Sequence, residues 1–376
     1  MTVQDRTRPT MPTRYWTIRP AQPNEAPAIL ELARAVHGFQ RPELNDSFLS
    51  WRYWNDTPFR ADILVAEHEG RFIGMQPVAV FDFQQGSERF KGAMYTGVQT
   101  HPDHRRRGVF RSLIDSSNAY AAERGAAFCL TMPNDDALAG FSAFGDWHYP
   151  GPIPTSFKII KRAALLRGGA AGAFIALAGS LPQAVFARRR GSSPNNRYSC
   201  VCSDTPADNL DDLADESARE FGGVCLRRTS AYWNWRYAVR PAASYRPTAA
   251  VSPAYRTLVL KEGTQPVGAV ATSVAHQAGL DVGLIVDLVA RGGLPVLRRL
   301  LFEAEAELRD RGVGLITCQA THPAMQTALK EEGHLLPNPR WLPRKFNFVY
   351  RPTDRRLPGG LALTDWHLTF GDSDNT

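Results

Sequence analysis

The sequence predicts an α/β protein made of two copies of one fold, on the strength of three observations. The chain has 376 residues, which is more than a single hydrophobic core usually spans. The tripeptide Trp51-Arg52-Tyr53 recurs as Trp235-Arg236-Tyr237. After each copy come a strand, a Gly-containing turn and a second strand, with a glycine at the same place in both, Gly74 and Gly268.

The predicted elements keep one order in both halves: helix, strand, hairpin, strand, helix, strand, helix. The hairpins cover residues 63–74 and 257–268. Each later helix ends in a charged pair and a glycine, Gly125 or Gly312, which suits the left-handed cap that stops a helix. An apolar strand follows each of these glycines.

The repeat suggests a division of the chain into domains. We expect one domain at residues 14–162 and a second at 198–350, joined by a helical and basic linker at 163–197. Residues 1–13 are polar and are expected to be disordered. The tail, 351–376, is aromatic, which favours a strand or hook packed on the body over a direct role in a site.

Composition and charge limit the classes of partner. The net charge is +7, the pI is about 9.3, and most basic residues are arginines, whose planar forks suit phosphate and carboxylate groups. No nucleic-acid-binding motif is visible, so no nucleic-acid partner is expected. The five scattered cysteines indicate neither a disulfide framework nor a metal site. The most apolar segment, 163–187, contains Arg167 and Pro182, so we expect a cytoplasmic protein without stable membrane insertion.

The strongest local signal is the segment 95–114, which reads as a strand, a Pro-containing turn, an Arg/Gly loop and an amphipathic helix. The first turn of a helix has unpaired N–H groups and the positive end of the helix dipole. Gly108 at that point lets a phosphate approach the backbone, and the neighbouring arginines add charge. The pattern predicts a pyrophosphate site, although it is neither a Walker loop nor a dinucleotide-binding loop.

This segment resembles the acetyl-CoA loop of the GNAT superfamily, whose hallmark is Arg/Gln-x-x-Gly-x-Gly/Ala after a strand ending in Val-x-Pro. Pro102, Arg105 and Gly108 match, and Asn134 and Ala137 match the family's next mark. The resemblance implies tandem domains, each a mixed, mostly antiparallel twisted sheet flanked by helices, with acetyl-CoA or a longer acyl-CoA as co-substrate and no metal. It implies that the donor's pantetheine arm, pyrophosphate and surroundings contact Val98, Thr100, Arg105, Arg106, Arg107, Gly108, Val109, Phe110, Arg111 and Asn134.

The sequence departs from the family pattern in several places. Thr100 stands where Val is usual, and Phe110 stands at the loop's last Gly/Ala, where its ring either narrows the site or points into the core. Phe141 replaces a tyrosine that could protonate the leaving thiolate. The second half has no such loop at residues 286–298, so we expect it to have lost donor binding and to supply scaffold and part of the acceptor pocket.

GNAT-type transfer is a direct attack of an amine on a thioester, which needs positioning and is helped by a general base. The candidate catalytic residues are Glu67, His101 and Asp135. Trp51, Tyr53 and Asp287 are the candidate substrate-binding residues, with packing as the alternative for the first two because their tripeptide is repeated.

The sequence leaves several functions open. The leading one is an acyl-CoA-dependent N-acyltransferase that acylates a primary amine of a small molecule or peptide. Alternatives are a long-chain acyltransferase that takes its acyl group from acyl-CoA or an acyl-carrier protein, and a non-enzymatic acyl-CoA-binding regulatory protein. Aminoacyl transfer from tRNA is compatible with a tandem fold, although the CoA-like loop argues against it.

Overall fold

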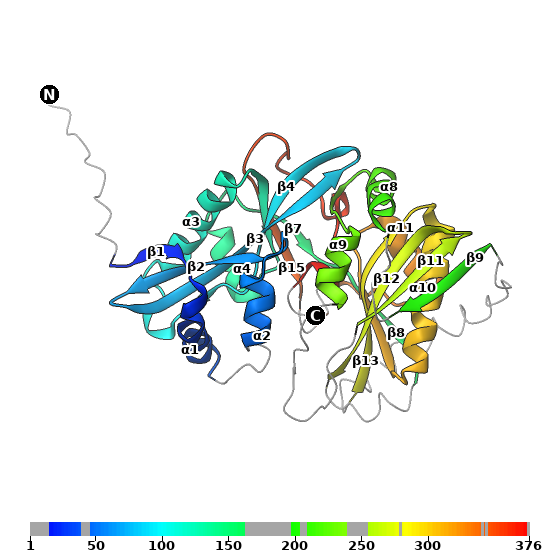
Figure 1. Ribbon diagram of the computed structural model, residues 1–376, viewed down its shortest axis with the longest axis horizontal. Helices are drawn as coiled ribbons and strands as arrows, with labels where there is room; N and C mark the ends of the chain where they lie inside the picture. Colours follow the sequence, from blue (N-terminus) through cyan, green and yellow to red (C-terminus); the bar gives the residue numbers. More distant parts are fainter. Residues whose placement is uncertain are drawn as a thin grey trace.

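The structure is a computed structural model, and it describes residues 15–38, 46–161, 197–203, 209–238, 255–277, 280–339, 342 and 345–373. The segment 1–13 and nearly all of the predicted linker, 163–196, lie outside the described residues. Two α/β halves lie side by side, each with a central sheet and flanking helices (Figure 1). The predicted fold class is confirmed.

The first sheet takes strands from both ends of the chain. Its main path runs β1-β2-β3-β4-β6-β15-β7, with β5 and β10 also pairing with β3, and β16 pairing with β10. Neighbours on the main path are antiparallel except for the parallel pair β4 and β6. The strands are β1 (Thr17–Pro20), β2 (Ala61–His68), β3 (Arg71–Gln85), β4 (Glu88–Tyr95), β5 (Gln99–Thr100), β6 (Ala126–Thr131), β7 (His148–Pro152), β10 (Val224–Leu226), β15 (Asn347–Pro352) and β16 (Trp366–His367).

The second sheet runs β8-β14-β13-β12-β11-β9, and its main path, like that of the first sheet, has one parallel pair among the described residues, β13 and β14. This pair occupies the place that β4 and β6 occupy in the first sheet. The strands are β8 (Thr155–Ile159), β9 (Tyr198–Ser203), β11 (Arg256–Glu262), β12 (Gln265–Gln277), β13 (Leu280–Ala290) and β14 (Leu315–Gln319).

The helices correspond in the same way between the halves. Helix α10 illustrates how these helices pack. Its apolar residues recur every three or four positions, so one side of the helix is buried on the sheet. The helices are α1 (Ala26–His37), α2 (Asp46–Leu49), α3 (Val109–Glu123) and α4 (Asp135–Ser142) in the first half, and α8 (Asp211–Phe221), α9 (Ser230–Trp233), α10 (Gly293–Asp310) and α11 (Pro323–Glu331) in the second.

The repeated glycines mark where a helix crosses its sheet closely. A Cβ on Gly74 of β3 would lie 2.9 Å from side-chain atoms of Leu113 and Val109 in α3. A Cβ on Gly268 of β12 would lie 3.1 Å from Leu300 of α10. The shared glycine therefore reflects packing in both halves.

The repeated Trp-Arg-Tyr tripeptides lie in short π-helical turns, Ser50–Trp54 and Asn234–Ala238, that meet each other. The rings of Trp51 and Trp235 stack with centroids 4.9 Å apart, and Trp51 Nε1 donates to the carbonyl of Trp235 at 3.1 Å. Both tryptophans belong to one hydrophobic core that the two halves share. The repeat therefore joins the halves.

The two halves also exchange strands. β8 follows the first half in sequence, yet it pairs with β14 in the second sheet. β15 follows the second half, yet it pairs with β6 and β7 in the first sheet. Each sheet therefore contains a strand that continues the sequence of the other half.

The C-terminal segment runs between the halves, coloured red in Figure 1. β16 pairs with β10, which in turn pairs with β3 of the first sheet. Trp366 is fully buried there and contacts Phe128 of β6, with ring centroids 5.3 Å apart. The segment then continues into the second half, as described below.

Candidate functional site

The first sheet opens between β4 and β6. The two strands pair in parallel as far as Tyr95 and Thr131. Beyond this point β4 leads into β5, which pairs only with β3, while β6 leads through Pro133 to the start of α4. The strands therefore stop pairing and diverge at their carboxyl ends. We call the region between them the first gap.

The chain bulges where it enters the first gap. β3 pairs with β4 up to Tyr95 opposite Val78, but the next pair is Gln99 opposite Met75, so the β4–β5 chain holds one extra residue there. Gly97, with φ of 55°, lies in this bulge, which covers Thr96–Val98. The bulge turns the chain away from regular pairing with β3 at the edge of the gap.

The backbone of β5 leaves one residue facing the gap. His101 donates its N–H to the carbonyl of Ile73 at 2.8 Å, so its backbone faces β3. Backbone groups alternate in direction along an antiparallel strand, so Thr100 turns its groups away from β3, toward the gap. Val98, the other residue predicted to pair with the pantetheine arm, lies in the bulge just before β5.

The Arg/Gly loop ends at the first turn of α3, beside the same gap. Arg106 has φ of 59°, which is uncommon for a residue other than glycine, and the helix N-cap Gly108 has φ of 91°. Arg105 to Gly108 are all exposed. Backbone strain in an exposed loop favours a functional explanation, and the start of a fifteen-residue helix supplies N–H groups for an anion.

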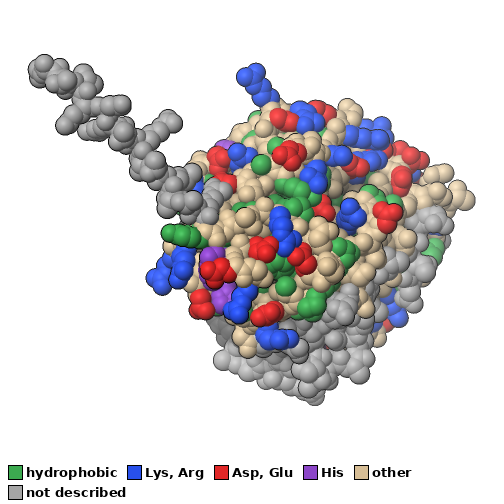
Figure 2. Space-filling view, turned by 60° about the vertical axis from the view of Figure 1, so that its left-hand side comes forward, with side chains coloured by type: hydrophobic (Ala, Val, Ile, Leu, Met, Phe, Trp, Pro, Cys, Tyr) green, Lys and Arg blue, Asp and Glu red, His purple; other side chains and the backbone are tan. Residues whose placement is uncertain are grey.

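The positive charge at this loop is local. Arg105 reaches back to the carbonyl of Thr100 at 3.4 Å, while the guanidinium of Arg111 lies 4.9 Å from the ring centre of Phe144. Over the face shown in Figure 2, Lys and Arg side chains alternate with Asp and Glu. Anion binding here thus depends on the loop and helix start rather than on a broad basic patch.

Of the two phenylalanines that depart from the family pattern, Phe141 is a core residue and Phe110 is partly buried against the core. Phe110 packs on Phe141 and Phe144, with ring centroids 5.4 Å and 6.2 Å away, and a Cβ on Gly140 would clash with its ring at 2.7 Å. Phe141 is buried against Trp147. Phe110 therefore points into the core and leaves the loop's backbone accessible, and the position of Phe141 is apolar.

Asp135 belongs to a polar group that spans the two ends of the chain. Asn134 caps α4 by accepting the N–H of Ala137 at 2.9 Å, which places Asp135 in the first turn. The fully buried Asn347 of β15 donates Nδ2 to Asp135 Oδ1 at 2.8 Å and accepts from the hydroxyl of Tyr149 at 2.9 Å. A residue of β15 thus orients the Asp135 carboxylate.

His101 lies at the loop side of the site. It forms edge contacts with His104, which in turn contacts His68, each pair with ring centroids 5.7 Å apart. Burial and the positive charge of Arg107 lower the pKa of His104. His101 Nδ1 accepts the N–H of Asp103 at 3.3 Å. The role of His101 as a base stays a prediction.

Glu67 lies at the end of β2, two strands away from β4. Its carboxylate is 2.7 Å from the guanidinium of Arg19, which also binds Glu25 at 2.6 Å. The Glu67 carboxylate is therefore already engaged in an ion pair. Its role as a base stays a prediction without support from its position.

The predicted substrate-binding residues are buried. Trp51 and Tyr53 are 2% and 8% exposed in the shared core. Asp287, in β13, is 1% exposed and is bound on all sides by the chain's own groups. These three residues hold the halves together in this structure, and a role in substrate binding stays a prediction.

The second sheet has a corresponding gap, which the chain's own tail fills. β13 and β14 pair in parallel as far as Ile285 and Cys318 and then diverge. The tail enters this second gap: Leu368 exchanges hydrogen bonds with Thr321, its N–H going to the Thr321 hydroxyl and its carbonyl accepting the Thr321 N–H. A small cavity remains there, lined by β13, β14, α11 and residues 367–369.

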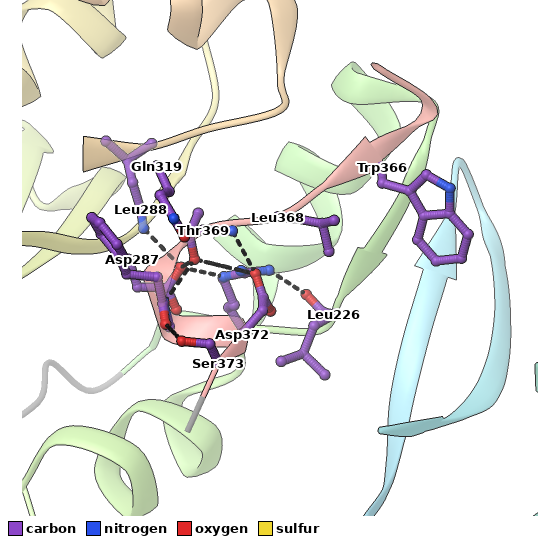
Figure 3. Close-up of polar contacts among 12 residues, drawn as sticks. Leu226, Asp287, Leu288, Gln319, Trp366, Leu368, Thr369, Asp372 and Ser373 are labelled. Atoms are coloured by element: carbon purple, nitrogen blue, oxygen red, sulfur yellow. Dashed lines mark hydrogen bonds and ion pairs between the residues drawn. The ribbon is translucent and has the colours of Figure 1, made fainter. Parts of the chain in front are cut away.

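A buried ion network anchors the tail. Arg228 binds Asp287 Oδ1 at 2.6 Å and Asp372 Oδ2 at 2.7 Å, and all three side chains are at most 2% exposed. Thr369 donates its hydroxyl to Asp287 at 2.9 Å, and Tyr237 donates to the other carboxylate oxygen at 2.8 Å (Figure 3). Burial raises the pKa of Asp372, against the effect of Arg228. The tail therefore occupies the second gap, and buried ion pairs hold it there.

Another buried group resembles a hydrolase triad without being one. Ser156 Oγ lies 3.1 Å from His334 Nδ1, and His334 Nε2 lies 3.1 Å from Glu305. All three are buried, and the serine also reaches the carbonyl of Cys318 at 3.1 Å. Lys158 binds Glu305 at 2.5 Å. We interpret this group as a set of structural contacts that hold β8 against the second half.

Within the residues that the structure describes, no group of three or more His, Cys, Asp or Glu residues could hold a metal ion. Among the helices of this part of the chain, none has the length and apolar character needed to cross a membrane.

Comparisons with known proteins agree with the fold. Residues 17–147 match the family model of the acetyltransferase (GNAT) domain. A GCN5-related N-acetyltransferase from Anabaena variabilis superposes with a TM-score of 0.60 at 12% identity, over 90% of this chain and 73% of that one. N-myristoyltransferase of Saccharomyces cerevisiae, solved with myristoyl-CoA, gives 0.55 at 7% identity, over 92% and 84%. Eis1 from Mycobacterium abscessus gives 0.52 at 15% identity, over 90% and 74%. Comparison with curated protein sequences gives no match.

Residues 17–147 of this α/β protein are therefore similar to the acetyltransferase (GNAT) domain. The structural likenesses, all at low identity, establish that it shares the fold of these enzymes over most of its length.

Proposed function

We propose that the protein is an acyl-CoA-dependent N-acyltransferase that acylates a primary amine of a small molecule or peptide, with its donor site in the first gap. The observation that carries the proposal is the arrangement of the bulge, β5 and the α3 loop along one opening. Backbone groups of Thr100 face that opening, and Val98 lies in the bulge that leads to it. The exposed loop Arg105–Gly108 and the start of α3 lie at its end, where a pyrophosphate would bind.

In this reaction the amine nitrogen attacks the thioester carbonyl carbon. A C–N bond forms, the C–S bond breaks, the amine loses a proton and the departing thiolate gains one. Holding the two reactants in line contributes up to about 7–11 kcal/mol to such a step. The phenol that the family uses is replaced by the buried Phe141, so the thiolate would take its proton from another group or from water.

Asp135 is the candidate that the geometry favours for attracting and deprotonating the amine. It begins α4, shortly after β6 ends at the first gap, is exposed, and is oriented by Asn347. A positioned general base contributes about 10²–10⁴-fold. Asp135→Asn should therefore lower kcat by at least about tenfold without weakening acyl-CoA binding. Asp136→Asn, a change at the neighbouring exposed carboxylate, should leave both unchanged.

The second half is proposed to act as scaffold and as one wall of the acceptor pocket. Its own gap holds the tail, and β15, which follows it in sequence, supplies Asn347 to the first site. This proposal predicts one donor molecule per chain.

A transfer assay tests the proposed function. Purified protein would be mixed with acetyl-CoA or a long-chain acyl-CoA and a panel of primary amines, and release of free thiol would be followed. Amine-dependent thiol release, abolished by Gly108→Asp, is the expected result. Binding without release on any amine would instead favour an acyl-CoA-binding protein, and release only from a carrier-protein donor would favour the long-chain alternative.

A further inference from the structure

A proline in β3 removes one hydrogen-bond donor beside the first gap. Pro77 lies opposite Thr96, the first residue of the bulge, and its carbonyl accepts the N–H of Thr96 at 3.3 Å. A regular antiparallel pair would return an N–H from residue 77 to the carbonyl of Thr96. Proline has no N–H. The carbonyl of Thr96 therefore needs another donor.

The neighbouring side chain supplies that donor. Gln76 is fully buried, and its Nε2 donates to the carbonyl of Thr96 at 3.2 Å and to that of Pro77 at 2.7 Å. One side-chain amide thus connects β3 to the first residue of the bulge. The bulge contains Val98 and leads into β5, where the backbone groups of Thr100 face the gap.

The buried side-chain amide of Gln76 lowers the stability of the fold. Gln76 Oε1 is buried and has no hydrogen-bond partner among the described residues. An unsatisfied buried acceptor costs roughly 1–3 kcal/mol. An apolar side chain would avoid this cost but would leave the carbonyl of Thr96 without its donor. This balance favours a role for Gln76 in shaping the gap rather than in stabilising the core.

We propose that Gln76 is a positioning residue for the acyl donor. Its amide replaces the missing N–H of Pro77 and fixes the Thr96–Val98 bulge, so that Val98 and Thr100 present their backbone groups to the pantetheine arm. The inference rests on the proposed function, because it names the element that shapes that same site. It assigns Gln76 no contact with the pyrophosphate, which would bind at the α3 loop.

The test is a double-mutant cycle read by ligand binding. Gln76→Met should weaken CoA binding about tenfold, whereas the affinity for ADP, which has a pyrophosphate but no pantetheine, should stay unchanged. Pro77→Ala restores a backbone N–H opposite Thr96, so it should be nearly neutral alone and should recover most of the lost affinity in the double variant. Melting temperatures of all variants would be measured alongside.

Gln84 provides a matched control. It is a second buried glutamine of β3, its Oε1 also lacks a partner among the described residues, and its Nε2 donates to the carbonyl of Gly86 at 2.7 Å, away from the gap. Gln84→Met should leave CoA binding unchanged.

The outcomes separate this inference from the proposed function. If wild-type protein binds CoA and Gly108→Asp abolishes the binding, while Gln76→Met binds as wild type does, the positioning role is wrong and the donor site stands. Equal loss of CoA and ADP affinity, or no recovery in the double variant, would also overturn it. If wild-type protein does not bind CoA at all, the proposed function fails and the inference fails with it.

Discussion

The two gaps of the molecule have the same strand geometry, but exposed groups lie beside the first and the chain's own tail fills the second. In the first gap, β4 and β6 diverge beside an exposed arginine loop and backbone groups that face the opening. In the second, β13 and β14 diverge in the same way, but the tail crosses between them and a buried network of Arg228, Asp287 and Asp372 closes the space. The fold alone therefore does not make a donor site, since the chemistry depends on what lines the gap.

The largest expected effect is on acyl-CoA binding, and it distinguishes the N-terminus of α3 from that of α10. Gly108 and Gly292 are the N-caps of α3 and α10, with φ of 91° and 88°. Gly108→Asp should weaken acyl-CoA binding more than about 100-fold, because a carboxylate would face the phosphates, and one factor of ten corresponds to about 1.4 kcal/mol. Gly292→Asp carries the same backbone strain and should not change binding. Equal effects of the two changes would contradict the assignment of the donor to the first gap.

The next effect concerns the network that closes the second gap. Arg228→Met leaves two carboxylates buried without their cation, which should lower the free energy of unfolding by about 3–5 kcal/mol. Arg89 also binds a carboxylate, that of Asp215 at 2.5 Å, but its side chain is 57% exposed, so Arg89→Met should cost less than about 1 kcal/mol. Urea denaturation of both variants measures the difference. Similar midpoints would show that the network does not anchor the tail.

A smaller effect should appear on acidification. Burial lowers the pKa of His367 well below its ordinary value, with Arg228 and His322 adding to the shift, and burial also lowers the pKa of His334. The unfolded chain takes up these protons near pH 6.5 while the folded chain resists them. Stability present above about pH 6.5 is therefore lost as the pH falls below it. His367→Gln should flatten this decline in melting temperature, and parallel declines would contradict the burial account.

Below about pH 4.5 a second group should contribute. Burial would raise the pKa of Glu305, but the hydrogen bond from His334 and the charge of Lys158 outweigh it and lower the pKa to about 2. Stability from this group should persist above pH 4.5 and be lost as the pH falls toward 2. Glu305→Gln should remove that part of the acid dependence.

The smallest expected effect is on activity, from Phe141→Tyr. The ring is buried against Phe110 and Trp147, so the new hydroxyl would lack a partner. We expect a loss of roughly 1–3 kcal/mol of stability and no gain in kcat. An increase in kcat would show that this position reaches the thiolate after all.

Local patterns in the sequence predicted much of this molecule. The repeat, the hairpins and the Arg/Gly loop are contiguous motifs, and the structure has a strand, turn or helix at each. Trp51 illustrates the limit, because the repeat of its tripeptide favoured packing but could not identify Trp235 as its partner.

Contacts between distant parts of the chain could not be predicted. Asn347 reaches Asp135 across 212 positions, and no local pattern marks it. Asp287 in an apolar strand was compatible with a cleft, and only the fold brings Arg228 beside it. Pro77 within a strand was a readable signal for an interrupted pairing, but the role of Gln76 depends on the register with Thr96.

The most direct test of the account is calorimetric titration of the purified protein with acetyl-CoA and then with a long-chain acyl-CoA. The account predicts one bound molecule per chain, lost on Gly108→Asp and kept on Gly292→Asp. Two bound molecules per chain, or binding that survives Gly108→Asp, would contradict the claim that the first gap alone takes the acyl donor.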